Sequence, residues 1–313
     1  MRVLAPAGYQ DRREEMPSTA QPRLDRRLLA LLLALLLAVP LAGAALGQAE
    51  ALARGDAAWA RRAEGAEAGR AAPGPIGEAI AAFEEAVRAA PESLEARWKL
   101  LRALYFQGDF VARDAAAKRQ VFDRGRRAFE EALALPAPRV GGRERLDALP
   151  PAEVARVFAD SPDVARLYFW GAVNWGLWGE AFGKIAAARQ GVGGRLLRYS
   201  QIVVALDPLY DDAGGRRLLG RLHAEAPKIP FLTGWVDRKI ALAELARAAA
   251  EGPADPFNRL YLAEAILNYA PERRQEALSL LRQVSEVEPR PDELVEDAAA
   301  RERAAALLAR ARG

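Results

Sequence analysis

The chain has 313 residues, enough for one large or two ordinary domains, and hydrophobic residues make up 51% of it. It contains no cysteine and only one histidine, His223, which excludes disulfides, zinc–thiolate sites, thiol catalysis and multi-histidine metal clusters. The 45 Lys and Arg residues nearly balance the 42 Asp and Glu residues, and the net charge of +3 excludes the basic footprint of a nucleic-acid-binding protein. Abundant Ala, Leu, Arg and Glu predict an all-α chain.

Residues 1–47 have the pattern of a secretory signal peptide. Arg26 and Arg27 precede the apolar run 28–39, which Pro40 closes, and the small residues that follow satisfy a small-x-small cleavage site. We therefore predict that residues 1–47 direct export and that the rest of the chain is periplasmic.

The start of this leader and its cleavage each have two possible interpretations. The chain starts at Met1 or at Met16, since either start leaves a basic segment before the apolar run. Residues 28–47 carry no charge and are just long enough to span a membrane. The leader is therefore either cleaved or retained as an inner-membrane anchor.

Residues 48–313 are predicted to form a single helical domain made of successive hairpins, and the first helix of this domain is predicted over 48–70. The helix predicted over 76–90 has apolar residues every three or four positions and ends at Pro91, which is the spacing of a tetratricopeptide repeat. Near the end of the chain, Pro256 and Pro289 lie 33 residues apart, close to the period of about 34 residues in that repeat. These intervals predict stacked tetratricopeptide-like hairpins.

Proline and glycine mark the breaks in the middle of the chain. The largest Pro/Gly-rich break covers 136–151 and is predicted to be a flexible loop. Ser161 is a favourable N-cap with Pro162 at the first helical position, and Asp207 followed by Pro208 repeats this arrangement. We therefore expect a long helix after each of these two dipeptides.

The first of these helices, predicted over 167–189, is the most aromatic part of the sequence. At 3.6 residues per turn Trp175 and Trp178 share one face, and Trp170 and Asn174 form an adjacent stripe. Because the helix is apolar almost all round, we expect it to be buried on several sides. Its aromatic side faces either a close-packed core or a ligand cavity.

Another face of this helix carries small residues, namely Ala172, Gly176, Gly179 and Gly183. Each glycine costs about 1 kcal/mol relative to alanine inside a helix, so we expect a close neighbour on this face. The helix expected after Asp207 and Pro208 has glycines that could be this neighbour, namely Gly214, Gly215 and Gly220. Glu180 and Lys184 are predicted to form a solvated i,i+4 pair.

Together these elements predict an all-α fold, either a tetratricopeptide-like α-solenoid or a closed ring of helical hairpins. A polar helix predicted over 292–312 would serve as its terminal cap. Such folds bind their partners on a concave surface or in an inner channel. A central pore or cavity is therefore expected.

Two segments carry a resemblance to a known family: YFWGAVNWGLW at 168–178 and ALDPLYDDAGGRRLLGRLHAEAPKIP at 205–230. With the export signal and the helical hairpins, they resemble the T-component proteins of tripartite ATP-independent periplasmic (TRAP) transporters, the TatT family. In that family an aromatic helix precedes a D-P-x-Y…G…R…G…P pattern. The matching residues here are Asp207, Pro208, Tyr210, Gly214 or Gly215, Arg217, Gly220 and Pro227.

The resemblance implies a periplasmic helical protein that pairs with a solute-binding protein. It also implies a pore or cavity that takes an apolar or amphipathic small molecule. Members are often lipoproteins, and this chain has no cysteine to lipidate, so a membrane tether would be the uncleaved leader or a partner. Self-association into a homo-oligomer is a further option.

The candidate ligand-binding residues are Trp170, Asn174, Trp175, Trp178, Tyr210, Arg217, Phe231 and Trp235. Arg217 and Arg221 either clamp a carboxylate together or pair with neighbouring acidic residues at the surface. Asn174 is either the polar group of a pocket or a structural hydrogen-bond partner, since a buried amide must be hydrogen-bonded. His223 is expected to be a structural or a surface residue and not a catalyst.

The sequence lacks the motifs of nucleotide-binding loops, serine hydrolases and zinc peptidases. We therefore predict no catalytic residues, no cofactor and no metal. The leading hypothesis is a non-enzymatic periplasmic subunit associated with a TRAP-type solute uptake system. The alternative is a general tetratricopeptide adaptor in cell-envelope assembly that binds no small molecule.

Overall fold

A computed structural model describes residues 45–228 and 233–312 of the chain. Within these residues the protein consists of helices and turns, with one isolated bridge between Glu67 and Arg70, so the predicted all-α class is confirmed. The predicted export leader lies outside the described residues except for positions 45–47, which begin the first helix.

The first helix covers residues 45–60. The α-helices that follow are α2 (Pro73–Ala89), α3 (Leu94–Phe106), α4 (Ala115–Ala132), α5 (Arg143–Ala148), α6 (Pro151–Val157), α7 (Pro162–Phe182), α8 (Lys184–Arg189), α9 (Val192–Leu206), α10 (Tyr210–Glu225), α11 (Arg238–Glu251), α12 (Pro256–Tyr269), α13 (Arg274–Glu286) and α14 (Leu294–Arg312). The shorter elements are a π-helical turn η1 (Gln107–Val111) and two 3₁₀ turns, η2 (Ala137–Val140) and η3 (Pro271–Arg273).

Local sequence signals set where several helices begin. Helices α2, α7 and α12 carry proline in the first turn, where the missing N–H has no intrahelical partner to lose. The Asp255 carboxylate caps α12 by accepting the backbone N–H of Phe257 at 2.8 Å. Ser161 stands at the cap position of α7, as predicted, but its hydroxyl donates to Asp160 and accepts from Arg139 instead of capping the helix.

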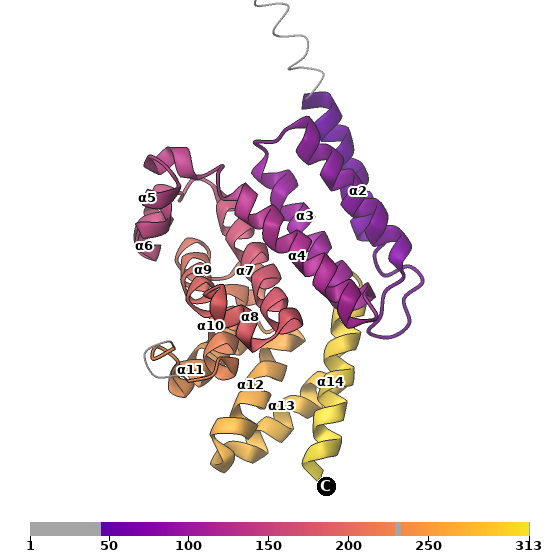
Figure 1. Cartoon of the computed structure of the whole chain (residues 1–313). Helices are drawn as coiled ribbons and strands as arrows, with labels where there is room; N and C mark the ends of the chain where they lie inside the picture. The colour runs from indigo at the N-terminus through magenta and orange to yellow at the C-terminus, as the bar shows by residue number, and fades with distance from the viewer. Residues whose placement is uncertain (1–44, 229–232, 313) are drawn as a thin grey trace, which may run out of the picture. The chain divides into compact units, whose positions relative to one another are not determined.

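Helices that follow one another in the chain pack against one another in space (Figure 1). Helix α2 packs on α3, α3 on α4 and α7, α7 on α9, and the contacts continue through α10, α11, α12 and α13 to α14. Apolar faces buried at these contacts form three clusters, one around the first helix, α2 and α3, one around α7, and one among α11 to α14. The stability of the fold therefore comes mostly from tertiary packing of these faces.

The C-terminal helix α14 returns to the beginning of the domain. The Arg62 guanidinium donates from Nε to Glu296 Oε1 at 2.9 Å, and the backbone N–H of Gly69 donates to Glu302 Oε1 at 3.2 Å. Val295 is buried in the same cluster as α2 and α3. The helical chain therefore closes on itself instead of ending as an open stack.

Helix α7 lies in the centre of its cluster, against α3, α4 and α9. Two glycines permit its close approach to α4. A Cβ on Gly171 would lie 2.2 Å from the Phe129 ring, and a Cβ on Gly125 would lie 2.0 Å from Asn174 Oδ1. Both helices thus meet at a distance that only glycine allows.

Three predicted segments have different boundaries in the structure. The stretch 136–151, predicted to be a loop, contains η2 and α5, because Leu146 is fully buried and anchors α5 to the core. The helix predicted over 167–189 is interrupted at Gly183, whose φ of +88° ends α7 and starts α8. The helix predicted over 48–70 stops at residue 60, after which the chain forms turns.

Candidate functional site

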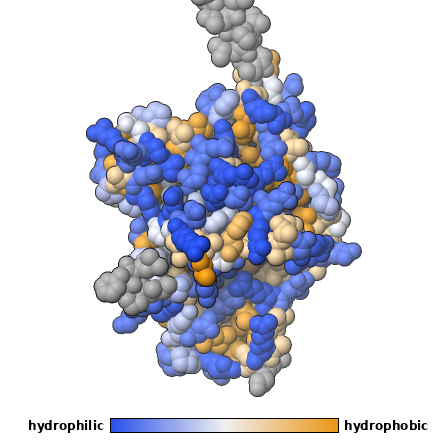
Figure 2. Space-filling view, viewed as in Figure 1, coloured by the Kyte–Doolittle hydropathy of each residue, from blue (hydrophilic) through white to orange (hydrophobic). Residues whose placement is uncertain are grey.

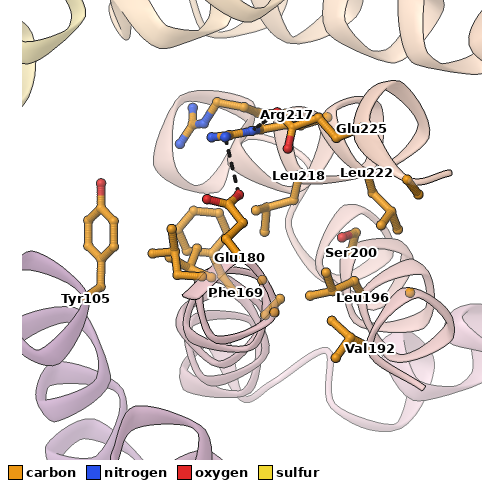
Figure 3. Close-up of a pocket in the computed structure, with 18 of the residues that line it drawn as sticks. Tyr105, Phe169, Glu180, Val192, Leu196, Ser200, Arg217, Leu218, Leu222 and Glu225 are labelled. Atoms are coloured by element: carbon orange, nitrogen blue, oxygen red, sulfur yellow. Dashed lines mark hydrogen bonds and ion pairs between the residues drawn. The ribbon is translucent and has the colours of Figure 1, made fainter. Parts of the chain in front are cut away.

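A cavity of about 1160 Å³ lies among the helices of the closed fold. Side chains from α3, α7, α9 and α10 point into it (Figure 3), and α8, α12 and the segment before α14 complete its wall. Its volume is slightly larger than the range of roughly 300–1,000 Å³ that small-molecule sites occupy. The cavity therefore has room for a sizeable organic ligand.

The middle of the cavity is apolar. Its wall there is formed by aliphatic and aromatic side chains from three helices, among them Phe169, Val192, Leu196, Leu218 and Leu222. An apolar ligand in this region gains about 25 cal/mol for each Å² of apolar surface that it removes from water. The wall favours a hydrophobic body over a polar one.

The small-residue face of α7 also lines this cavity, with Ala172, Gly176, Gly179 and Gly183. The prediction that it meets the glycines of α10 is wrong. Gly214 packs against Phe169, Gly215 against Val203, and Gly220 against Leu245. Because both the small face and the aromatic face of α7 are apolar, the sequence pattern could not decide which one meets open space.

The tryptophans on the other face of α7 are in the core. Trp175 is 1% exposed and donates from Nε1 to Glu130 at 3.0 Å, while Trp178 donates to Asp123 at 3.1 Å and stacks on Phe182. Neither indole lines the cavity. Of the two alternatives left open for these side chains, the geometry matches a close-packed core.

Asn174 is fully buried between α3 and α7. Its amide donates from Nδ2 to the carbonyl oxygens of Leu101 at 3.0 Å and Trp170 at 2.8 Å. It does not line the cavity. The amide thus links two helices, which corresponds to the structural alternative.

Trp170 and Tyr210 do meet at the cavity wall, from α7 and from the start of α10. Trp170 Nε1 donates to the Tyr210 hydroxyl oxygen at 2.9 Å, and Phe169 packs edge-on against the Tyr210 ring. Burial raises the pKa of the Tyr210 hydroxyl, so it keeps its proton. The Tyr210 hydroxyl cannot donate this proton to Trp170, because an indole nitrogen is only a donor. The proton is therefore available to a different acceptor.

Of the remaining candidates, Trp235 is half-buried and packs edge-on against His223 and close to Gly193, outside the cavity wall. Phe231 lies outside the described residues. His223 is buried and accepts the backbone N–H of Asp237 at 3.1 Å, which fits its predicted structural role.

Helix α10 begins with an unusual backbone. Asp211, Asp212 and Ala213 have φ values of 54°, 50° and 59°, in the left-handed region that is costly for residues other than glycine. Contacts from distant segments hold this turn, since Asn258 donates from Nδ2 to the Asp212 carbonyl oxygen at 2.7 Å. Asp211 and Asp212 line the cavity, so the strained turn is part of its wall.

Arg217 stabilises the same turn from within. Its guanidinium lies 2.5 Å from Asp211 and 2.8 Å from Asp255, and it also donates to Asn258. Burial raises the pKa of the Asp211 carboxyl to about 6, even though the positive charge of Arg217 acts in the opposite direction. Arg217 therefore reaches the cavity as an internal ion pair that joins α10 to α12.

Arg221, one turn further along α10, is likewise paired. It lies 2.6 Å from Glu225 and 3.4 Å from Glu180, and it donates to the Tyr261 hydroxyl at 2.6 Å. Burial raises the pKa of Glu180. Glu180 thus pairs across the cavity with α10 (Figure 3) instead of forming the predicted pair with Lys184.

Sequence reasoning missed a further arginine at the wall, Arg102 of α3. Its guanidinium lies 4.1 Å from the centre of the Trp59 ring and 5.1 Å from that of Trp98. Its Nε is buried without a hydrogen-bond partner, and no residue in the described part of the chain forms an ion pair with it. The only sequence signal for Arg102 is the aromatic residues near it in the chain.

The outer surface in the view of Figure 2 is mostly hydrophilic, with hydrophobic side chains scattered among polar ones. Among the described residues, Ile185, Leu46 and Leu209 are the most exposed large hydrophobics, at 72%, 66% and 60%. No described helix is both long and apolar enough to cross a bilayer. The described residues also contain no cluster of three or more acidic, His or Cys side chains that would hold a metal ion.

The sequence was compared with models of known protein families and with curated proteins. It matches none of them. The case for a function therefore rests on the geometry of the cavity and on the resemblance carried by its residues.

Proposed function

We propose that this protein is a non-enzymatic periplasmic subunit that works with a TRAP-type solute uptake system, binds a solute-binding protein and holds an apolar small molecule. The observation that carries the proposal is the cavity of about 1160 Å³ with an apolar middle, which lies among the helices of a chain that closes on itself. A packed adaptor needs no such space, because protein interiors are normally close-packed.

The placement of the family-like segments supports the ligand-holding part of the proposal. Phe169, Gly176 and Leu177 come from the aromatic segment, and Tyr210 and Leu218 come from the segment after Asp207. Two stretches recognised for their resemblance thus both supply side chains to the wall of one cavity. The order of helical hairpins is the arrangement that we propose to be tetratricopeptide-like.

A binding role also agrees with the state of the charged groups in the cavity. The guanidinium groups of Arg217 and Arg221 are each held by two carboxylates within 3.4 Å. Side chains fixed in this way orient one another and do not activate a nucleophile. We therefore keep the proposal non-enzymatic.

The alternative function is an adaptor in cell-envelope assembly. The close packing of Trp175 and Trp178 favours it, because these two indoles offer nothing to a ligand. The exposed Ile185 on α8 would then belong to a protein–protein contact.

Native mass spectrometry of the protein isolated from its own periplasm, combined with chemical crosslinking, separates the two functions. We expect a co-purifying apolar molecule, crosslinks to a solute-binding protein, and a mass that also reports any self-association. Crosslinks only to envelope-assembly factors, with no bound small molecule, would overturn the transport role.

A further inference from the structure

One end of the cavity holds a positive charge without a counter-ion. Arg102 extends from α3 to the cavity wall, where Trp59 and Trp98 lie on its guanidinium. Cation–π contacts position such a group but leave its N–H donors unused. Within the described residues, no carboxylate, carbonyl or hydroxyl oxygen accepts a hydrogen bond from Arg102.

The carboxylates that act electrostatically on Arg102 are already paired with other cations. Asp56 and Glu293 are the negative side chains whose charges act on this guanidinium. Asp56 lies 2.7 Å from Lys99, and Glu293 lies 3.1 Å from Arg62. Burial lowers the pKa of Arg102, which reflects the cost of holding the cation out of water without a partner.

The other arginines of the inner wall are satisfied. Arg217, Arg221 and Arg290 each lie within 2.8 Å of at least one carboxylate oxygen. Lys184 and Arg189 of α8 are exposed, so water solvates them. Among the described cations of the cavity, Arg102 is therefore the one that gains most from an incoming anion.

Two hydroxyl groups lie beside this end of the cavity. Tyr105 is one turn after Arg102 on α3, extends into the cavity (Figure 3), and packs on Trp170 with 5.4 Å between ring centres. Tyr210 receives the Trp170 N–H and keeps its own proton for another acceptor. Both hydroxyls are therefore donors on the same side as the guanidinium.

From these contacts we propose that the cavity takes a monocarboxylate with an apolar body, with the carboxylate on Arg102, Tyr105 and Tyr210 and the body along the apolar middle. This inference rests on the proposed ligand-holding function and narrows it to one chemical class. An uncharged ligand would leave the guanidinium unpaired, whereas a carboxylate supplies the planar, two-oxygen acceptor that matches it.

The test uses the full-length protein with Nile red as an uncharged reporter of cavity occupancy, and decanoate and decan-1-ol as competitors of equal chain length. We expect decanoate to displace Nile red roughly 10- to 100-fold more strongly than decan-1-ol, the range that follows from a hydrogen-bonded ion pair. Arg102→Gln should remove this difference while leaving the affinities for Nile red and decan-1-ol unchanged.

Two further variants sharpen the result. Arg102→Lys keeps the charge but loses the two-pronged geometry, so part of the preference for decanoate should remain. Tyr105→Phe removes one hydroxyl and should weaken decanoate several-fold, which keeps the test valid if Arg102→Gln fails to fold. Arg156→Gln, at an exposed position of α6 outside the cavity, is the matched control.

The two proposals fail in different ways. If wild-type protein binds Nile red but prefers decan-1-ol or treats both competitors alike, the carboxylate site is overturned and the apolar cavity stands. The same holds if folded Arg102→Gln binds decanoate as wild type does. If none of the three probes binds, the ligand-holding function fails and the carboxylate site fails with it.

Discussion

Arg62 and Glu296 are 234 positions apart in the chain, yet Arg62 Nε lies 2.9 Å from Glu296 Oε1. Both side chains are almost fully buried, at 5% and 11% exposure, and Arg62 also lies 3.1 Å from Glu293. Glu293 and Glu296 line the cavity. The contact that closes the helical chain is therefore also part of the wall of the candidate site.

Replacing Arg62 should destabilise the whole domain. Arg62→Met leaves the buried carboxylate of Glu296 without its cation, and we expect the free energy of unfolding to fall by about 3–5 kcal/mol. Urea unfolding followed by circular dichroism measures this change. The neighbouring Arg61, which is 46% exposed and pairs only at the surface, is the control, and Arg61→Met should change stability by less than about 1 kcal/mol. Equal effects of the two substitutions would show that the closure is energetically unimportant.

The contact between α4 and α7 should not tolerate a methyl group. In Gly125→Ala the new Cβ would lie 2.0 Å from Oδ1 of Asn174, whose amide is held by two hydrogen bonds. We expect a loss of about 1–3 kcal/mol from overpacking. At Gly77 in α2 a Cβ would meet no atom within 4 Å, so Gly77→Ala should raise stability by up to about 1 kcal/mol. A thermal unfolding series tests both signs, and a stable Gly125→Ala would contradict the packing described.

Adjacent residues on α7 should separate stability from ligand binding. Gly176 lines the cavity, and its nearest side-chain neighbour would be an ordinary 3.7 Å from a Cβ, so Gly176→Phe should fill the space and abolish Nile red binding. Trp175 is core, so Trp175→Phe should cost about 1–3 kcal/mol of stability and leave Nile red affinity unchanged. Fluorescence titration of both variants with Nile red measures the two affinities. The reverse pattern would place the ligand on the tryptophan face.

Stability should depend on pH through Asp211. Its pKa is raised from 3.8 to about 6 in the folded protein, so between these values the folded state binds more protons than the unfolded state. This carboxyl therefore favours folding below about pH 4, and that contribution is lost as the pH rises towards 6, for a total of about 1–3 kcal/mol.

The corresponding measurement compares wild type with Asp211→Asn. Urea unfolding at several pH values between 4 and 7 should show wild type losing stability relative to the variant as the pH rises. Above about pH 6 the difference should become constant, because Asp211 is then ionised in both states. Parallel stability curves for the two proteins would mean that the folded-state pKa is not raised.

Much of the fold was predictable because the signals for it are local. Proline in the first turn marks the starts of α2, α7 and α12, and the Asp255 side chain caps α12 two residues away. The break at Gly183 is also local in origin, since φ of +88° needs glycine, but the sequence pattern did not distinguish it from the other glycines of α7. The abundance of Ala, Leu, Arg and Glu was sufficient to predict an all-α chain.

The candidate site was predictable only in part. Three of the candidate ligand-binding residues, Trp170, Tyr210 and Arg217, line the cavity. Trp175 and Trp178 are in the core, although all three tryptophans belong to one apolar helix. Hydrophobicity indicates that a helix is buried but not which of its apolar faces meets protein and which meets space.

Tertiary structure also decided which arginines have a carboxylate partner. Arg217 is held by Asp211, six positions away, and by Asp255 of a distant segment, while Arg102 has no such partner. By itself the sequence determined the helices, their order and the absence of thiol chemistry, because caps, prolines and periodicity act over a few residues. Only the closed tertiary structure decided where the cavity lies and which arginine faces it unpaired, because ion pairs and packing join residues that are dozens to hundreds of positions apart.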